Sequence, residues 1–186
     1  MELQTTIVIG STVTMRYSAH EDQHAFPTAE EAAGRAAIVE EALSWTGTPF
    51  VNCGDIKGPN GAVDCAMLLV RSYVDTGRLA PFDPRPYSPS WNLHRTEQKF
   101  LNWIETRLGA HEVDDLRLGD VIVWQFGRCF SHGGIAINSR QVVHAYYVAG
   151  IVLVSDLHEP TLESVTLAGK DYPRPRKYYD VWGRNE

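Results

Sequence analysis

The chain of 186 residues is poor in cysteine and contains no long apolar run. Its three cysteines are an odd number without close pairs, so they form neither a disulfide framework nor a structural zinc site, and we expect reduced thiols. No stretch approaches the length that spans a bilayer, and the N-terminus lacks a basic region followed by an apolar run. We therefore expect a protein that is made in the cytoplasm without a signal peptide and has no membrane partner.

Positive charge is also scarce. The 23 acidic and 17 basic side chains give a net charge of -6 at pH 7, which argues against nucleic acid as a partner. There is no internal repeat and no low-complexity segment. With 44% hydrophobic residues, the chain can bury one core of ordinary size. We expect no cofactor.

One metal-binding pattern is present. The residues His20-Glu21-Asp22-Gln23-His24 match the H-E-x-x-H pattern of zinc proteases. That chemistry needs both histidines on one face of a long, partly buried helix. Here the segment is polar, is closed by Pro27 and has no apolar stripe around it, so the helix is poorly supported. We therefore expect no metal site.

Helical signals dominate the first two thirds of the chain. Residues 1–27 are predicted to form a β-hairpin appendage, and residues 28–186 a single catalytic domain. A capping box of Thr28 and Glu31 predicts a helix that runs to about Trp45. Further helices are predicted from Cys65 to about Thr76 and, with Ser88 or Ser90 as the cap, from about Trp91 to Leu108.

From Asp120 onward the hydrophobic period changes from helical to extended. Short connections join five β-prone runs, which indicates an antiparallel meander: Val121–Phe126, Gly133–Ile137, Val142–Tyr147, Ile151–Val154 and Tyr178–Trp182. Helices followed by strands predict an α+β fold in which the N-terminal helices pack on one side of a C-terminal antiparallel sheet.

Cys65 follows a loop rich in glycine and proline and begins an apolar helix, with Asp64 as the predicted N-cap. Unpaired N–H groups and the macrodipole at a helix start favour a thiolate, which predicts a lowered thiol pKa. Taken alone, the position fits a small buried hydrophobe better, because most free cysteines are of that kind. Further residues are needed to distinguish a nucleophile from a core residue at Cys65.

Two histidines supply the missing partners. His132 begins one predicted strand and His144 lies in the next, at comparable distances from the turn between them, so both side chains can share one face of the hairpin. Each alone fits a structural role. Together with Cys65, and with the Cys65 helix packed over that face, they form the Cys-His-His relay that nucleophilic catalysis needs. Cys53 and Cys129 lie at no predicted helix start and are interpreted as ancillary.

Over residues of about 30 to 157, the chain resembles the NlpC/P60 family of papain-like cysteine peptidases. Five motifs in the same order carry the resemblance: Trp45-Thr46-Gly47-Thr48-Pro49-Phe50, Asp64-Cys65, Leu118-Gly119-Asp120-Val121-Ile122-Val123-Trp124, His132-Gly133-Gly134-Ile135-Ala136-Ile137 and Val143-His144-Ala145. The resemblance implies a papain-like fold with Cys65 as nucleophile, His132 as base and His144 as the residue that orients the base. It also implies substrate-binding positions at Asp64, Phe50, Gly133 and Trp124.

Members of this family typically cleave peptide bonds in the stem peptides of bacterial cell walls, so the resemblance implies a peptidoglycan peptide as substrate. The segment Pro86-Tyr87-Ser88-Pro89-Ser90-Trp91 is most similar to the branch encoded with phage tails and phage-like gene transfer particles. That branch implies phage tail proteins as partners and a virion-associated enzyme that acts on the cell wall.

Three residues depart from the family pattern. Ala66 and Met67 stand where a serine and a glycine are usual, and Phe50 stands where an aromatic hydroxyl is usual; in relatives such residues help to hold a free amine or an oxyanion. Two alternatives therefore stay open. One is an acyltransferase or amidase acting on lipid or protein, which an apolar cleft wide enough for a chain would favour. The other is a non-catalytic tail assembly protein. For the peptidase, a persistent thiolate–imidazolium pair predicts a pH optimum near neutrality.

Overall fold

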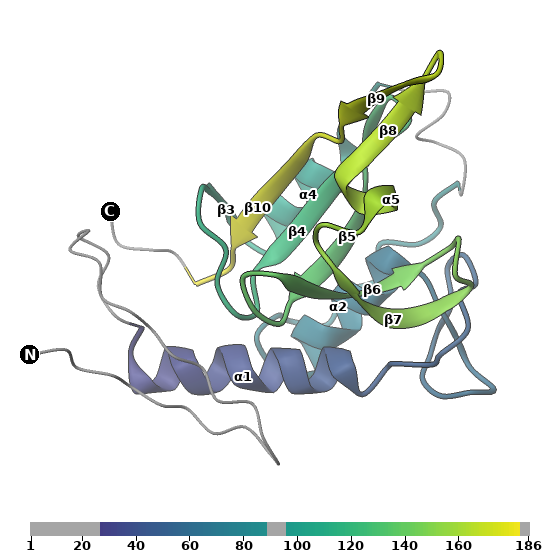
Figure 1. Cartoon of the computed structure of the whole chain (residues 1–186). Helices are drawn as coiled ribbons and strands as arrows, with labels where there is room; N and C mark the ends of the chain where they lie inside the picture. The colour runs from purple at the N-terminus through teal and green to yellow at the C-terminus, as the bar shows by residue number, and fades with distance from the viewer. Residues whose placement is uncertain (1–26, 89–95, 183–186) are drawn as a thin grey trace, which may run out of the picture.

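A computed structural model describes residues 27–88 and 96–182. The predicted N-terminal hairpin, the His20–His24 pattern and the predicted helix start at Trp91 lie outside the described residues. The elements are α1 (Ala29–Leu43), β1 (Asp55–Ile56), β2 (Ala62–Val63), α2 (Cys65–Asp75), α4 (Lys99–Arg107), β3 (His111–Val113), β4 (Val121–Phe126), β5 (Cys129–Ala136), β6 (Gln141–Tyr146), β7 (Ile151–Asp156), α5 (Pro160–Glu163), β8 (Ser164–Leu167), β9 (Lys170–Pro173) and β10 (Arg176–Asp180) (Figure 1).

A six-stranded antiparallel sheet in the order β3-β10-β4-β5-β6-β7 forms the centre of the structure. Strands β4 to β7 are the predicted meander. The fifth predicted strand, β10, is not its continuation: the chain crosses back through α5 and the β8–β9 hairpin, and β10 pairs with β4 and β3. The α+β class is confirmed, and the prediction of a five-stranded meander is wrong in this one connection.

The two faces of the sheet are covered differently. The larger core lies between the sheet and the helices α1, α2 and α4, and it includes Ile38, Leu68, Leu69, Ile104, Val121, Ile135 and Val143. The smaller core lies on the other face, where Leu162 of α5 packs against Ile122, Trp124 and Val142. Figure 1 shows α4 behind β4 and β10 and α5 in front of the sheet. All three longer helices therefore lie on one side of the sheet, as predicted.

The helix starts were predicted with mixed success. The Thr28 hydroxyl accepts from the Glu31 N–H at 3.1 Å and caps α1 as expected. The third long helix, however, begins at Lys99 among the described residues, and residues 96–98 before it are not helical, so the predicted unbroken helix is wrong there. The Gln98 side chain accepts from the Phe130 N–H at 3.0 Å, so a tertiary contact with β5 fixes the residue at which α4 begins.

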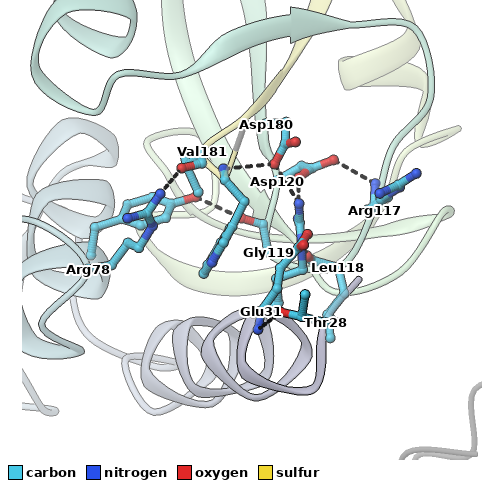
Figure 2. Close-up of polar contacts among 12 residues, drawn as sticks. Thr28, Glu31, Arg78, Arg117, Leu118, Gly119, Asp120, Asp180 and Val181 are labelled. Carbon is cyan, nitrogen blue, oxygen red and sulfur yellow. Dashed lines mark hydrogen bonds and ion pairs between the residues drawn. The ribbon is translucent and has the colours of Figure 1, made fainter. Parts of the chain in front are cut away.

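One buried arginine ties α1 to the sheet. Arg35 donates to Asp120 at 2.6 Å and to Asp180 at 2.5 Å, and its Nη1 also donates to the Leu118 carbonyl at 2.9 Å (Figure 2). Both aspartates are fully buried. On the outer side, the Glu31 carboxylate accepts from Arg35 Nε at 2.7 Å. Helix α1 is thus held in place by charge as well as by its apolar side.

Candidate active site

Cys65 is the first residue of α2, and the residues around it hold it there. The Asp64 side chain accepts from the Met67 N–H at 2.9 Å, so Asp64 is the helix cap that the sequence predicts. Leu68 and Leu69 are fully buried and anchor the helix in the core. Cys65 as a whole residue is partly exposed. It is therefore rigidly held and still open to a substrate.

The Cys65 sulfur lies against the backbone of β5 where this strand separates from β6. Within the described residues, β5 pairs with β6 only at Ile135 and Ala136. Beyond that point, Cys65 Sγ donates to the Ser131 carbonyl at 3.8 Å and accepts from the Gly133 N–H. The sulfur thus lies at the part of β5 that is not paired with β6.

His132 and His144 contact each other directly. His132 Nε2 lies 2.8 Å from His144 Nδ1, and His144 Nε2 lies 3.0 Å from Ser155 Oγ on β7. The prediction that both imidazoles share one face of the hairpin is confirmed. Because His144 occupies Nε2 of His132, Nδ1 is the ring nitrogen that remains for Cys65.

The expected position of α2 relative to this pair is wrong. The two imidazoles lie on the face of Trp124, whose ring centroid is 5.6 Å from that of His132 and 6.2 Å from that of His144. Helix α2 packs on the opposite face, against Ile135 and Val143. Cys65, the first residue of α2, and His132 nevertheless both line one pocket.

Burial shifts both the Cys65 thiol and the His132 imidazole towards their neutral forms. Burial raises the pKa of the Cys65 thiol to about 12, and the charge of Asp64 adds to the rise. Burial, together with His144 and the charge of Arg174, lowers the pKa of His132 well below its ordinary value. Burial also lowers the pKa of His144 to about 4. The expected lowering of the thiol pKa by the helix start is therefore wrong, because desolvation outweighs the backbone N–H groups.

A pocket of about 890 Å³ opens at the sulfur. Cys65, Asp64, Phe50 and His132 line it, and aromatic rings form much of its wall: Phe50, Tyr87, Phe100, Trp103, Phe126 and Tyr147. Lys99, Asn52 and Ser131 are among its polar lining residues. Cys65 and His132 thus open into one cavity, whose volume is in the range of ligand-binding pockets.

Two of the predicted substrate-binding residues lie elsewhere. Trp124 is fully buried, and its ring packs against the imidazoles of both histidines. Gly133 contributes its N–H to the sulfur, and a Cβ at this position would lie 2.9 Å from Phe100 and 3.0 Å from Leu69. Neither is among the described residues that line the pocket. Gly133 is needed for the close approach of α2 and α4 to β5.

Tyr87 is a site residue that the sequence did not reveal. Its hydroxyl lies 2.9 Å from both carboxylate oxygens of Asp64, which also accepts from the Cys53 N–H at 2.6 Å. The Tyr87 hydroxyl thus joins another segment of the chain to this aspartate. The segment that contains it, Pro86-Tyr87-Ser88-Pro89-Ser90-Trp91, indicated a similarity to the tail-encoded branch and not a contact with Asp64.

We expect Tyr87→Phe to lower the free energy of unfolding by about 1–2 kcal/mol, because a buried carboxylate loses a hydrogen bond. Urea denaturation measures the change. Tyr172→Phe is the matched control, since Tyr172 is 48% exposed, and it should leave the stability unchanged. Equal stability of the two variants would show that the hydroxyl does not hold the segment on Asp64.

Two negative findings apply to the described residues alone. No three His, Cys, Asp or Glu side chains among them are grouped so that they could hold a metal ion. None of their helices has the length and apolarity needed to cross a membrane.

Three solved structures are similar to this chain. The NlpC1 protein of Trichomonas vaginalis matches with a TM-score of 0.50 and 16% identity over 79% of this chain and 43% of that chain. The NlpC/P60 domain of the peptidoglycan hydrolase SagA matches with a TM-score of 0.43 and 24% identity, over 66% and 89%. The peptidoglycan hydrolase RipB of Mycobacterium tuberculosis matches with a TM-score of 0.48 and 20% identity, over 84% and 68%.

No protein-family model matches the sequence, and the search of curated proteins finds no match. The chain spans less than half the length of the Trichomonas structure. That structure shows the fold: helices on one side of an antiparallel sheet, in the NlpC/P60 arrangement.

Proposed function

We propose that this chain is a cysteine peptidase that hydrolyses amide bonds in the stem peptides of bacterial cell walls. One observation carries the chemistry: Cys65 and His132 open into the same pocket, and His132 is joined to His144 at 2.8 Å. A nucleophile, a base and an orienting group are the three parts that this reaction needs. The resemblance of the five sequence motifs to NlpC/P60 peptidases supports the choice of substrate.

In the proposed reaction, His132 Nδ1 takes the proton of the Cys65 thiol as the sulfur attacks the carbonyl carbon of the substrate amide. The N–H of Cys65, at the start of α2, donates to the oxyanion that forms. His132 then passes its proton to the leaving nitrogen as the C–N bond breaks and a thioester remains. Water, deprotonated by His132, attacks the thioester, releases the acid and restores the thiol.

The pKa directions revise the expected pH dependence. Activity is lost on the acid side when His132 takes up a proton, and the lowered pKa moves this loss below pH 6.5. On the alkaline side the activity changes when the Cys65 thiol ionises. The raised thiol pKa of about 12 moves this change above the pH range of the assay. We expect kcat/KM to be flat from about pH 6 to 9 with a substrate that has no titrating group there. A bell with limbs near the ordinary pKa values of histidine and cysteine would contradict the neutral pair.

The test is digestion of purified cell-wall peptides by the wild type and by Cys65→Ala, with the products identified by mass spectrometry. Cleavage by the wild type alone supports the proposal and identifies the bond. If neither protein cuts any wall peptide, and a thiol-directed acylating reagent does not modify Cys65 either, a non-catalytic tail assembly protein becomes the better explanation.

We further propose that the enzyme reaches the wall as part of a phage tail or a related particle. The similarity of residues 86–91 to the tail-encoded branch supports this. Mass spectrometry of purified particles from a producing strain tests it, because a particle component copurifies at constant ratio to the tail proteins, and a free enzyme is lost on washing.

A second candidate function is acyl transfer on the same residues. The size of the pocket, about 890 Å³, and its aromatic wall favour it, since such a wall also fits an acyl chain. Incubation with a lipid ester distinguishes the two functions: an acyltransferase forms a stable thioester on Cys65 from the lipid and does not cut wall peptides.

A further inference from the structure

Ser155 ends the series of side chains that begins at His132. It lies on β7 opposite Val142 of β6, so its side chain is on the same face of the sheet as His144 and diagonal to it. Its hydroxyl is 3.0 Å from His144 Nε2. The exposed fractions of His132, His144 and Ser155 are 6%, 0% and 5%, so water is largely kept from these three groups.

We propose that Ser155 is a positioning residue that places the proton of His144 on Nε2 and thereby keeps Nδ1 of His132 able to accept a proton from Cys65. This inference deepens the proposed function and rests on it. Ser155 touches no reacting atom. It acts through His144, which acts through His132.

The directions of the hydrogen bonds follow from one another. For His132 Nδ1 to accept the thiol proton, the ring must carry its own proton on Nε2 and donate it to His144 Nδ1. His144 then has to carry its single proton on Nε2, and the acceptor for that proton is Ser155 Oγ. If the serine donated, each bond would reverse and His132 Nδ1 would hold a proton, which makes it useless as a base.

An imidazole at position 144 creates this requirement. A carboxamide in its place would offer an oxygen that is always an acceptor, whereas a neutral imidazole has one donor and one acceptor nitrogen that can exchange. Burial lowers the pKa of His144 to about 4, so at pH 7 the ring carries one proton, and that proton can be on either nitrogen. The third residue of the relay therefore needs a fourth to fix its tautomer.

The experiment reads the tautomers and the kinetics separately. The full chain is labelled with 15N-histidine, and the ring nitrogens of His132 and His144 are observed at pH 7 in the wild type, Ser155→Ala and Ser155→Thr. Ser72→Ala is the matched control, because Ser72 is also fully buried and its hydroxyl bonds to the Leu68 carbonyl. The kinetics of wall-peptide cleavage are measured on the same four proteins.

We expect protonated Nε2 and unprotonated Nδ1 on both histidines of the wild type. In Ser155→Ala the signal of His144 should move towards a mixture of tautomers, and kcat should fall on the order of ten-fold with KM unchanged, because a buried N–H loses its acceptor. Ser155→Thr keeps the hydroxyl and should restore both readouts, and Ser72→Ala should alter neither.

Unchanged ring nitrogens in Ser155→Ala would overturn the inference, as would a wild type with its proton on Nδ1 of His132. If the wild type shows the expected tautomers but cuts no wall peptide, the proposed function fails while the role of Ser155 in placing the proton stands. If Ser155→Ala does not fold, Ser155→Thr decides: loss of the tautomer with the hydroxyl present contradicts the inference.

Discussion

His132→Gln is expected to lower kcat for amide cleavage at pH 7 by roughly a thousand-fold or more. The reason is the state of Cys65. Burial keeps the pKa of its thiol at about 12, so very little thiolate exists at neutral pH without a base beside it. Glutamine is close to histidine in size, so the site stays filled while the base is lost.

The pH dependence of this variant provides a sharper test than the size of the loss. Without His132, the thiolate has to form by direct loss of its proton to solvent, so the residual rate should rise nearly ten-fold per pH unit between pH 7 and 9. The wild type should stay flat over the same range. His158→Gln is the control, because His158 is exposed and pairs with Glu163 away from the pocket. A residual rate within ten-fold of the wild type would remove His132 from the proposed mechanism.

Local signals in the sequence were sufficient to predict most helices and strands and the contact between the two histidines of the site. The caps at Thr28 and Asp64 depend on contacts within a few residues, and both were predicted. The alternation of strand side chains, which places every second residue on one face, also predicted that His132 and His144 meet across a turn. These contacts involve residues close together in the sequence, so local sequence patterns predict them.

Contacts between residues far apart in the sequence, and the depth of burial, were not predictable from local patterns. The return of β10 to the far side of β4 depends on which edge of the sheet is free, and no local pattern encodes it. Tyr87 lies 23 residues after Asp64, and nothing in the sequence pairs the two. The thiol pKa was predicted in the wrong direction because a helix start is visible in a sequence and the depth of burial is not.

Arg35→Met is expected to lower the free energy of unfolding by about 3–5 kcal/mol at pH 8. The substitution keeps the length of the side chain but removes the charge that faces Asp120 and Asp180 (Figure 2). Two fully buried carboxylates then lose their shared cation. Thermal or urea denaturation measures the loss. Arg71→Met is the matched control: its ion pair with Asp75 is partly exposed, and its removal should change the stability by less than about 1 kcal/mol.

The stability lost in Arg35→Met should depend on pH, and the pKa of Asp120 gives the direction of this dependence. Burial raises the pKa of this carboxyl from 3.8 to about 6 even with Arg35 present, so the folded state binds the proton more tightly than the unfolded state does. Such a group supports the fold most below about pH 4, and that support is lost as the pH rises through 6. Removing Arg35 raises the pKa further, so the difference between variant and wild type should be smaller at pH 5 than at pH 8.

Neutralising the carboxylates separates lost charge pairing from lost packing. Arg35→Met combined with Asp120→Asn and Asp180→Asn removes the buried charges between α1 and the sheet, and it should recover a large part of the stability and lose the pH dependence that Asp120 contributes between pH 5 and 8. If the triple variant is as unstable as Arg35→Met alone, the guanidinium stabilises α1 through its packing and its bond to the Leu118 carbonyl. Recovery would show that the arginine is required because the two aspartates are buried. The position of α1 on the sheet would then depend on that charge pairing.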